Sequence, residues 1–312
     1  MVEIFLKTLP FFLLIGVGYA AAASKFFSEA AANALTRFVF FFALSAMLFR
    51  FSANLSFGEV FDGRFMLVYL AATGAAYAVF TAVAMWRKVP VAEAAVEAQC
   101  AAIGNIGFLG IPMLALLMGD AAVGYIMMML AVDLGVFGSL IVILITGSRE
   151  RLSPRVFRTV AVGLVSNPML VSIFAGFSVS ALEISIPTPA NEFLTLLGNA
   201  ATPGALFAIG ASLASKSAER LSVAAWLSFG KLVIHPAFVA LAAIVIWPVE
   251  PYAAAVMIAS AALPTAGNIY MVAQYYGVAP HRVSATILIS TAASIVTVSL
   301  VLAWLAQFTA FQ

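Results

Sequence analysis

Charged side chains are scarce in this sequence of 312 residues. Aspartate, glutamate, lysine and arginine make up 9% of it, whereas hydrophobic residues make up 64%. A soluble domain carries roughly 25% charged residues, so this chain has too few to cover a surface that faces water. Lipid is therefore the expected solvent, and lipid admits only helices or a closed barrel. Barrel strands alternate polar and apolar residues, whereas this sequence has unbroken apolar runs such as 38–49 and 66–85. These runs predict helices.

Several other features are absent or rare. Cys100 is the single cysteine, which excludes an intrachain disulfide. The net charge of +2 is spread out, so no nucleic-acid partner is expected. No Gly-x-x-x-x-Gly-Lys-Ser/Thr loop is present, which argues against an ATP-driven pump. An intramembrane protease needs either two deep carboxylates, where only Asp133 is found, or a nucleophile turn, which is lacking around Ser212 near His235. We therefore expect no enzyme activity, no cofactor and no metal.

Apolar segments long enough to span a bilayer recur along the whole chain. The N-terminus lacks the basic region of a cleaved signal, so the first segment is expected to be a retained span. The joins are short, which favours one compact bundle. About ten segments are predicted, near 4–23, 33–52, 65–86, 94–118, 121–146, 158–179, 191–214, 221–247, 252–276 and 283–308.

Basic residues set the predicted orientation. Joins after the odd-numbered segments hold eleven Lys and Arg, and the opposite side holds three. Because cytoplasmic loops carry the excess of positive charge, both termini should lie outside. The most basic join, 148–158, separates two halves, 1–147 and 159–312, of five segments each. An odd number of spans inverts the second half relative to the first, as in many secondary transporters.

Two segments carry interruptions at matching places. Residues 104–112 read GNIGFLGIP, and residues 263–270 read LPTAGNIY. Proline removes a backbone donor and glycine lowers the energy needed to leave helix geometry. A shift of 159 positions (264 minus 105) sets Asn105 against Pro264. Paired interruptions of this kind indicate a transporter binding site.

The interruptions define the candidate binding residues. If the two segments cross at their breaks, half-helix N-termini and unpaired N–H groups face inward and suit a carboxylate. Glycine and proline also serve plain helix packing in membranes, and this alternative stays open. The candidate substrate-binding residues are Asn105, Gly107, Pro112, Pro264, Thr265, Asn268, Tyr270 and Gln274.

Three ionisable residues lie deep within predicted spans. Asp133 is near the middle of the fifth segment, and Lys231 and His235 lie one turn apart in the eighth. A charge at the bilayer centre costs roughly 2.5–3.5 kcal/mol on insertion scales, so such groups normally face inward and pair. We predict that Asp133 pairs with Lys231 and that Asp133 or His235 carries a coupling proton. A purely structural ion pair is the alternative.

Five stretches resemble the auxin efflux carrier family. Residues 104–112 are similar to the asparagine-and-proline signature of its fourth helix, and 263–265 with 273–277 to its ninth-helix region. Residues 202–210 and 231–236 look like stretches of bacterial members. The resemblance covers essentially the whole chain.

The resemblance implies a structure and a mechanism. It implies ten helices in two inverted repeats, related to bile-acid sodium symporters. Spans 1, 2, 6 and 7 would form a scaffold, and spans 3–5 and 8–10 a transport domain with elevator-type movement. It further implies a homodimer in the bacterial inner membrane and an organic anion at the crossover, where Asn105 and Pro264 match the family's residues. The role of Asn268 rests on its position alone.

These observations predict a secondary transporter of a small organic anion. Bacterial members are associated with malonate and similar carboxylates, which favours a dicarboxylate. A sodium-coupled symporter of the bile-acid type is an alternative, because carbonyls and hydroxyls near the breaks suit a sodium ion. A channel is a further alternative. The expected partners are the anion, protons or sodium, the lipid bilayer and a second copy of the chain.

Overall fold

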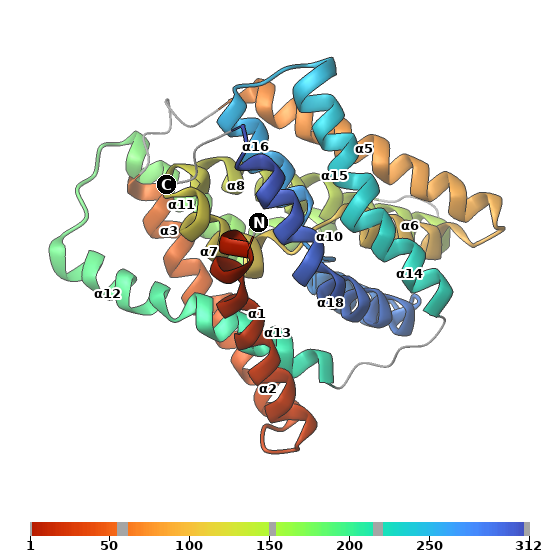
Figure 1. The fold of residues 1–312 in the computed structure, drawn as a ribbon, viewed down its shortest axis with the longest axis horizontal. Coiled ribbons are helices and arrows are strands. Elements are labelled where there is room, and N and C mark those ends of the chain that lie inside the picture. Colours follow the sequence, from red (N-terminus) through yellow and green to blue (C-terminus); the bar gives the residue numbers. More distant parts are fainter. Residues whose placement is uncertain (1, 55–61, 150–153, 215–220, 309–312) are drawn as a thin grey trace.

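The chain folds almost entirely into helices, as its composition predicts. The computed structural model describes residues 2–54, 62–149, 154–214 and 221–308. Within these ranges no β-strand forms, apart from one isolated bridge between two helix breaks. Figure 1 shows the helices packed side by side into one body. The all-helical class is therefore confirmed.

Helices of the first half follow the predicted apolar segments. The η elements among them are π-helical turns, in which the helix widens locally. The order is α1 (Val2–Ala23), α2 (Glu29–Phe38), η1 (Val39–Ala43), α3 (Leu44–Asn54), α5 (Gly63–Trp86), α6 (Val91–Ala102), η2 (Ile106–Gly110), α7 (Ile111–Met118), α8 (Ala121–Val132), η3 (Asp133–Phe137) and α9 (Gly138–Arg149).

The second half repeats this style of long helices interrupted by short ones. Its order is α10 (Pro154–Val165), α11 (Pro168–Ala181), α12 (Thr188–Asn199), α13 (Ala201–Ala214), α14 (Leu221–Phe229), η4 (Gly230–Ile234), α15 (His235–Ala240), η5 (Leu241–Ile246), α16 (Pro251–Ala261), α17 (Asn268–Tyr276) and α18 (Pro280–Leu305).

Six helices are long and apolar enough to cross a membrane. A seventh crossing results if the segments on either side of Asn167, which are bent by 63°, form one span. The other three predicted segments contain the shorter apolar helices Thr8–Ala23, Ile106–Met118 and Pro251–Ala261, of which the last two belong to broken segments. The count of ten crossings and the inverted repeat therefore stay predictions. The six long helices are Glu29–Asn54, Gly63–Trp86, Ala121–Arg149, Thr188–Ala214, Leu221–Ile246 and Pro280–Leu305.

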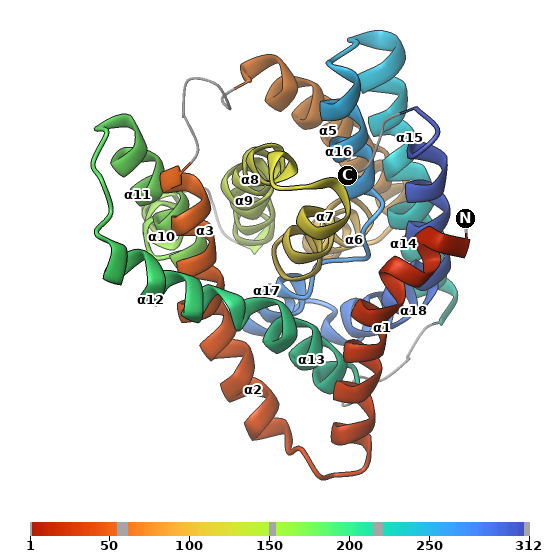
Figure 2. The same cartoon turned by 60° about the vertical axis from the view of Figure 1, so that its left-hand side comes forward.

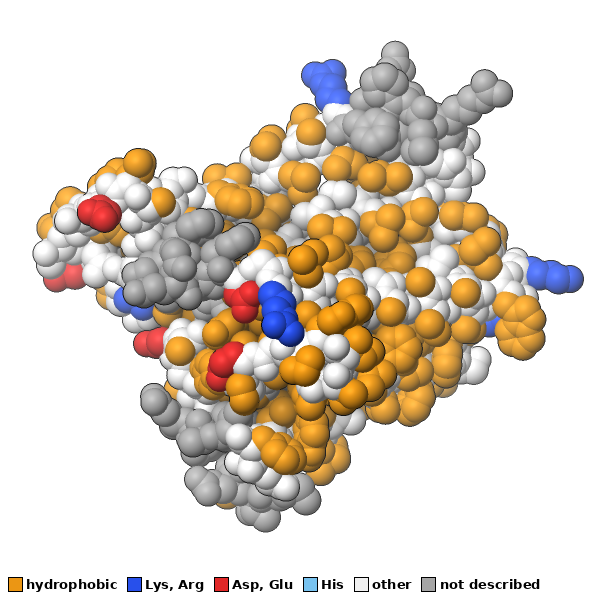
Figure 3. All heavy atoms as spheres, turned by 90° about the horizontal axis from the view of Figure 1, so that it is seen from above, with side chains coloured by type: hydrophobic (Ala, Val, Ile, Leu, Met, Phe, Trp, Pro, Cys, Tyr) orange, Lys and Arg blue, Asp and Glu red, His pale blue; other side chains and the backbone are white. Residues whose placement is uncertain are grey.

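Large apolar side chains also cover the outside of the molecule. Figure 3 shows hydrophobic side chains over much of one face and charged groups at only a few positions. Trp86 and Leu196 are 85% and 75% exposed. Continuous apolar surface of this extent marks a membrane or protein contact rather than a face in water. This surface agrees with a multi-pass membrane protein.

The helices pack as two groups. The peripheral group is α1–α3 with α11–α13, in which α1 packs along α13 and α3 packs against α11 and α12. The crossing group is α5–α9 with α14–α18, in which α5 packs on α6 and α15, and α14 packs on α18. In Figure 2 the peripheral group occupies the lower and left part, and α5, α14, α15 and α16 lie on the opposite side.

Glycines bring the helices of the peripheral group into backbone contact. A Cβ atom at Gly18 in α1 would overlap the carbonyl of Phe207 in α13, and one at Gly210 would overlap the carbonyl of Ile15. A Cβ atom at Gly176 in α11 would lie 2.6 Å from the carbonyl oxygen of Phe49 in α3. Small residues at such crossings let membrane helices approach closely, where dispersion forces replace the hydrophobic effect.

Candidate functional site

The fourth apolar segment breaks where the sequence predicts. After α6 ends, Ile103 is extended (φ −98°, ψ 121°) and Asn105 leaves helix geometry (φ −78°, ψ 55°). The chain then enters the π-helical turn η2, whose amide N–H groups at Leu109 and Gly110 both donate to the carbonyl of Asn105, at 3.1 and 3.0 Å. Pro112 lies in the first turn of α7, where a missing N–H is tolerated.

The ninth segment breaks in the same manner. Helix α16 ends at Ala261, and α17 begins at Asn268 with Gly267 at its N-cap. Between them, Pro264 lacks an N–H donor and disfavours helical geometry at Leu263. Both of these residues are buried. The predicted interruption is therefore confirmed in each segment.

The two breaks meet and hydrogen-bond to each other. Gly104 and Thr265 form an antiparallel bridge. Around it, the amide of Asn105 donates to the carbonyl of Pro264 at 2.8 Å, and the amide of Ala266 donates to the carbonyl of Ile103 at 3.1 Å. The breaks thus satisfy much of each other's backbone, as buried polar groups require. They form a crossover between α6–α7 and α16–α17.

Several donors at the crossover remain available. The amide N–H groups of Ile106, Gly107 and Phe108 begin η2 and have no acceptor among the described residues. Asn105 is only 7% exposed, yet its side-chain amide bonds to no described residue either. Unpaired N–H groups at a helix start carry positive partial charge and favour an anion. The expected unpaired amides therefore exist on the fourth segment.

Other predicted residues have different surroundings. Thr265 is committed to the crossover, because its hydroxyl donates to the carbonyl of Cys100 at 2.9 Å and its amide donates to the Ser290 hydroxyl at 3.2 Å. Asn268 and Gln274 are exposed and Tyr270 is half-buried. The structure thus joins Asn105, Pro264 and Thr265 at one point, and it leaves Asn268 and Gln274 on the surface of α17.

Gly107 marks a close approach between the two helix groups. A Cβ atom there would lie 2.7 Å from the terminal methyl of Met169 in α11. A Cβ atom at Gly110 would lie 2.6 Å from a methyl of Leu263, next to the other break. Both glycines therefore permit tight packing around the crossover, which is the packing role that the sequence left open.

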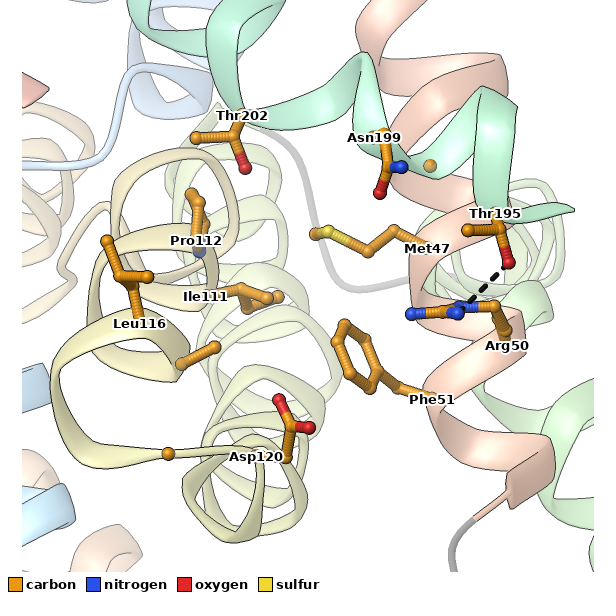
Figure 4. A pocket seen from close by; sticks show the side chains of 13 residues that line it. Met47, Arg50, Phe51, Ile111, Pro112, Leu116, Asp120, Thr195, Asn199 and Thr202 are labelled. Carbon is orange, nitrogen blue, oxygen red and sulfur yellow. Dashed lines mark hydrogen bonds between the residues drawn. The ribbon is translucent and has the colours of Figure 1, made fainter. Parts of the chain in front are cut away.

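A cavity of about 540 Å³ opens beside α7, the helix that follows the first break. It lies between α3, α7 and the junction of α12 with α13, so that both helix groups line it. Figure 4 shows Pro112 and Ile111 on one wall and Arg50 with Thr195 on the other. Of the predicted binding residues, Pro112 lines this cavity. Arg50 is one of the three Lys and Arg residues on the predicted outer side, and the sequence indicated no other role for it.

The three deep ionisable residues do not form the predicted ion pair. The Asp133 carboxylate accepts a hydrogen bond from the Tyr69 hydroxyl at 2.7 Å, and its second oxygen has no partner among the described residues. Lys231 donates to the carbonyl of Ala261 and lies 3.1 Å from Nδ1 of His235. Two polar side chains of α5 contact these groups instead: Tyr69 bonds to the acid and Thr73 to the histidine.

These buried groups nonetheless lie along one line of polar contacts. His235 Nε2 lies 3.1 Å from the Thr73 hydroxyl, and Thr73 lies one helical turn from Tyr69, which donates to Asp133. An ammonium group only donates hydrogen bonds. If Lys231 is charged, Nδ1 of His235 accepts from it and Nε2 carries the proton and donates it to the Thr73 hydroxyl, while the Tyr69 hydroxyl donates to Asp133. We call Lys231, His235, Thr73, Tyr69 and Asp133 the buried relay.

The relay reaches the crossover itself. A Cβ atom at Gly104 would lie 3.2 Å from Nζ of Lys231, and Ala261, which accepts from Lys231, ends α16. The charged end of the relay therefore contacts both halves of the crossover. The sequence did not predict this arrangement. The third predicted segment has no Asp, Glu, Lys, Arg or His in its interior, and it contributes the hydroxyl groups of Tyr69 and Thr73 instead.

A second buried charge cluster was not predicted. Glu97 in α6 is 1% exposed and receives hydrogen bonds from Arg87 at 2.8 Å and from Arg282 at 2.5 Å. Arg282 also pairs with Glu93 at 3.1 Å. A buried carboxylate needs such partners. The cluster ties α6 to the end of α5 and the start of α18, and so holds the first half of the crossover in place.

Comparison with known proteins gives the family. The model of a family described as membrane transport protein matches residues 3–302. The chain belongs to this family. It is the auxin efflux carrier family, which the sequence resembles. A Rhizobium meliloti (strain 1021) protein named "Putative malonate transporter" is 31% identical over 306 residues, or 96% of this chain and 95% of that protein. The chain is thus a membrane transporter and not an enzyme.

Proposed function

We propose that this transporter moves a small carboxylate, with malonate as the first candidate, by secondary active transport. The observation that carries the proposal is the crossover: two broken segments meet, and the amides of residues 106–108 and the side chain of Asn105 have no partner among the described residues. Neutral donors of this kind bind an anion and release it again. The name of the 31% identical relative supports malonate.

The mechanism we propose is alternating access of the elevator type. The peripheral group would act as the scaffold, in line with predicted spans 1, 2, 6 and 7. The crossing group would be the moving domain, in line with spans 3–5 and 8–10. The packing supports this division, because each group buries its helices mainly within itself and the cavity lies between the two. Inverted repeats, ten crossings and a homodimer in the bacterial inner membrane complete the proposal.

Coupling to protons is part of the proposal. The buried relay ends at Asp133, whose second carboxylate oxygen has no partner among the described residues, and begins beside Gly104 at the crossover. A proton on Asp133 or His235 would thereby change the charge balance next to a bound anion. Sodium coupling is the alternative. It is favoured by the buried Ser260 hydroxyl and the Gln99 carbonyl oxygen, which also have no partner in the described part of the chain.

Transport in proteoliposomes tests the proposal. We expect malonate uptake that is accelerated by malonate on the opposite side, which a channel does not show. Asn105→Ala should raise the malonate concentration needed for half-maximal uptake about tenfold, because it removes one hydrogen bond to a charged group. Gln307→Ala, just after the end of α18, is the control. Equal kinetics in both variants would refute the crossover site, and a requirement for a sodium gradient would favour the symporter.

A further inference from the structure

Arg50 is placed unusually for a charged residue of an apolar helix. It lies one turn before the end of α3 and lines the cavity between the two helix groups. One of its terminal nitrogens, Nη1, donates to the Thr195 hydroxyl at 3.0 Å, and that hydroxyl donates to the carbonyl of Asn191 at 2.7 Å. The guanidinium carbon lies 5.4 Å from the centre of the Phe51 ring. The arginine is therefore held in position from within the peripheral group.

No acidic side chain of the described residues neutralises Arg50. Asp120 lines the same cavity but is exposed and forms no ion pair with it. In Figure 4 the Phe51 ring lies between the two charged groups. A guanidinium has five N–H donors, and the hydrogen bond to Thr195 uses one. Its remaining donors have no partner in the described part of the chain, which leaves a positive charge facing the cavity.

The rest of the cavity wall is suited to a carboxylate. Asn199 and Thr202 point into the cavity in Figure 4, and neither side chain bonds to a described residue. The opposite wall is α7, which begins directly after the η2 turn that carries the unpaired amides. Arginine binds carboxylates in bidentate fashion, with geometric selectivity that a lone ammonium lacks.

We propose that Arg50 binds one carboxylate of a dicarboxylate substrate in this cavity, and so makes the transporter prefer dicarboxylates over monocarboxylates. Asn199 and Thr202 donate to the same group. The inference rests on the proposed function and extends it, because the crossover residues do not distinguish one carboxylate from two. The charge on Arg50 gives a reason for preferring the doubly charged anion.

Binding of malonate and of its monomethyl ester to the purified full-length protein tests this inference. Arg50→Gln should weaken malonate binding about tenfold, while binding of the monoester changes little. Arg50→Lys keeps the charge without the bidentate geometry, so its malonate affinity should lie between those of the wild type and Arg50→Gln. Arg64→Gln is the matched control, because Arg64 is exposed at the start of α5 and does not line the cavity.

The outcomes separate this inference from the proposed function. Equal malonate affinities in Arg50→Gln and Arg64→Gln overturn the role of Arg50, whereas a loss in Asn105→Ala in the same experiment leaves the crossover site standing. A wild-type protein that binds the monoester but not malonate, succinate or oxalate also overturns the inference alone. A wild-type protein that binds no carboxylate overturns both.

Cysteine labelling provides a second test if Arg50→Gln does not fold. Cys100 is fully buried, so an introduced cysteine reacts against a low background. Malonate should slow modification of Asn199→Cys by a charged thiol reagent, and it should not affect Ile184→Cys in the exposed loop after α11. Equal rates with and without malonate at both positions contradict binding in the cavity.

Discussion

In the proposed mechanism, single residues of the buried relay would respond to protons. Tyr69 and Thr73 lie one turn apart on α5 and connect Asp133 to His235 without any direct ion pair. All of these side chains are at most 3% exposed. Buried ionisable groups are retained in membrane proteins where they serve transport or pairing. Here the pairing is incomplete at Asp133, which favours a role in transport.

Removing one relay group should uncouple transport from the proton gradient. We expect wild-type malonate uptake to respond to a pH difference across the membrane. Tyr69→Phe and Asp133→Asn should abolish that response while exchange of malonate for malonate continues, because exchange needs no net proton movement. The measurement is uptake into proteoliposomes with and without the gradient.

A matched substitution on the same helix controls for packing. Tyr77 is also buried on α5, but its hydroxyl donates to the carbonyl of Ala95 and lies outside the relay. Tyr77→Phe should therefore keep the response to pH. A wild-type protein that ignores the gradient, or a Tyr69→Phe protein that responds as wild type does, removes the coupling hypothesis.

Residue positions were predicted from the sequence only where the backbone itself signals them. Asn105 and Pro264 were found because glycine and proline interrupt an apolar run, and this signal is local. The partners of Glu97 and the setting of Arg50 depend on helices far apart in the chain. No spacing within one helix reveals such contacts, so the sequence predicts neither the buried cluster around Glu97 nor the place of Arg50 in the cavity wall.

At the scale of elements, the broken segments were predictable and the π-helical turns were not. Turns η3 and η4 begin at Asp133 and one residue before Lys231, respectively. A π-helical turn widens the helix by one residue and often occurs at functional positions. Its sequence is unremarkable, because the extra residue is accommodated by packing against neighbouring helices. Asp133 and Lys231 of the relay therefore lie in helix irregularities that only the structure reveals.

Close contact between α1 and α13 predicts a sharp difference between two glycines of one helix. Gly18→Ala places a Cβ atom against the carbonyl of Phe207, whereas Gly16→Ala meets no atom within 4 Å. Overpacking should lower stability by about 1–3 kcal/mol at Gly18. The same change at Gly16 should be neutral or stabilise by up to about 1 kcal/mol, because alanine favours helix.

Thermal unfolding in detergent measures this difference. The midpoint should fall for Gly18→Ala and stay level or rise for Gly16→Ala. Gly210→Ala, on the other side of the same contact, should resemble Gly18→Ala because it meets the carbonyl of Ile15. Equal midpoints for Gly16→Ala and Gly18→Ala would contradict backbone contact between α1 and α13.

At the scale of the whole molecule, the hydrophobic composition predicted the class and the distribution of arginine and lysine predicted an orientation. Six or seven helices satisfy the length and hydropathy of a membrane span. The broken segments escape that test because each half is too short to cross alone. Orientation is a property of the chain in its membrane, so it follows from the positive-inside rule rather than from helix packing.

Labelling from outside the cell tests the predicted orientation. Ile184 lies in a join predicted to be external and is 54% exposed, and Phe26 lies in a join predicted to be cytoplasmic and is 89% exposed. Cys100 is fully buried, so the wild-type protein should react little with a membrane-impermeant maleimide. Ile184→Cys should be labelled on intact cells, and Phe26→Cys only after the membrane is made permeable.

The reverse pattern would place both termini in the cytoplasm and would turn the Arg50 cavity toward the cell interior. Labelling of both positions on intact cells would show that the two joins share one side, which an odd number of crossings between them forbids.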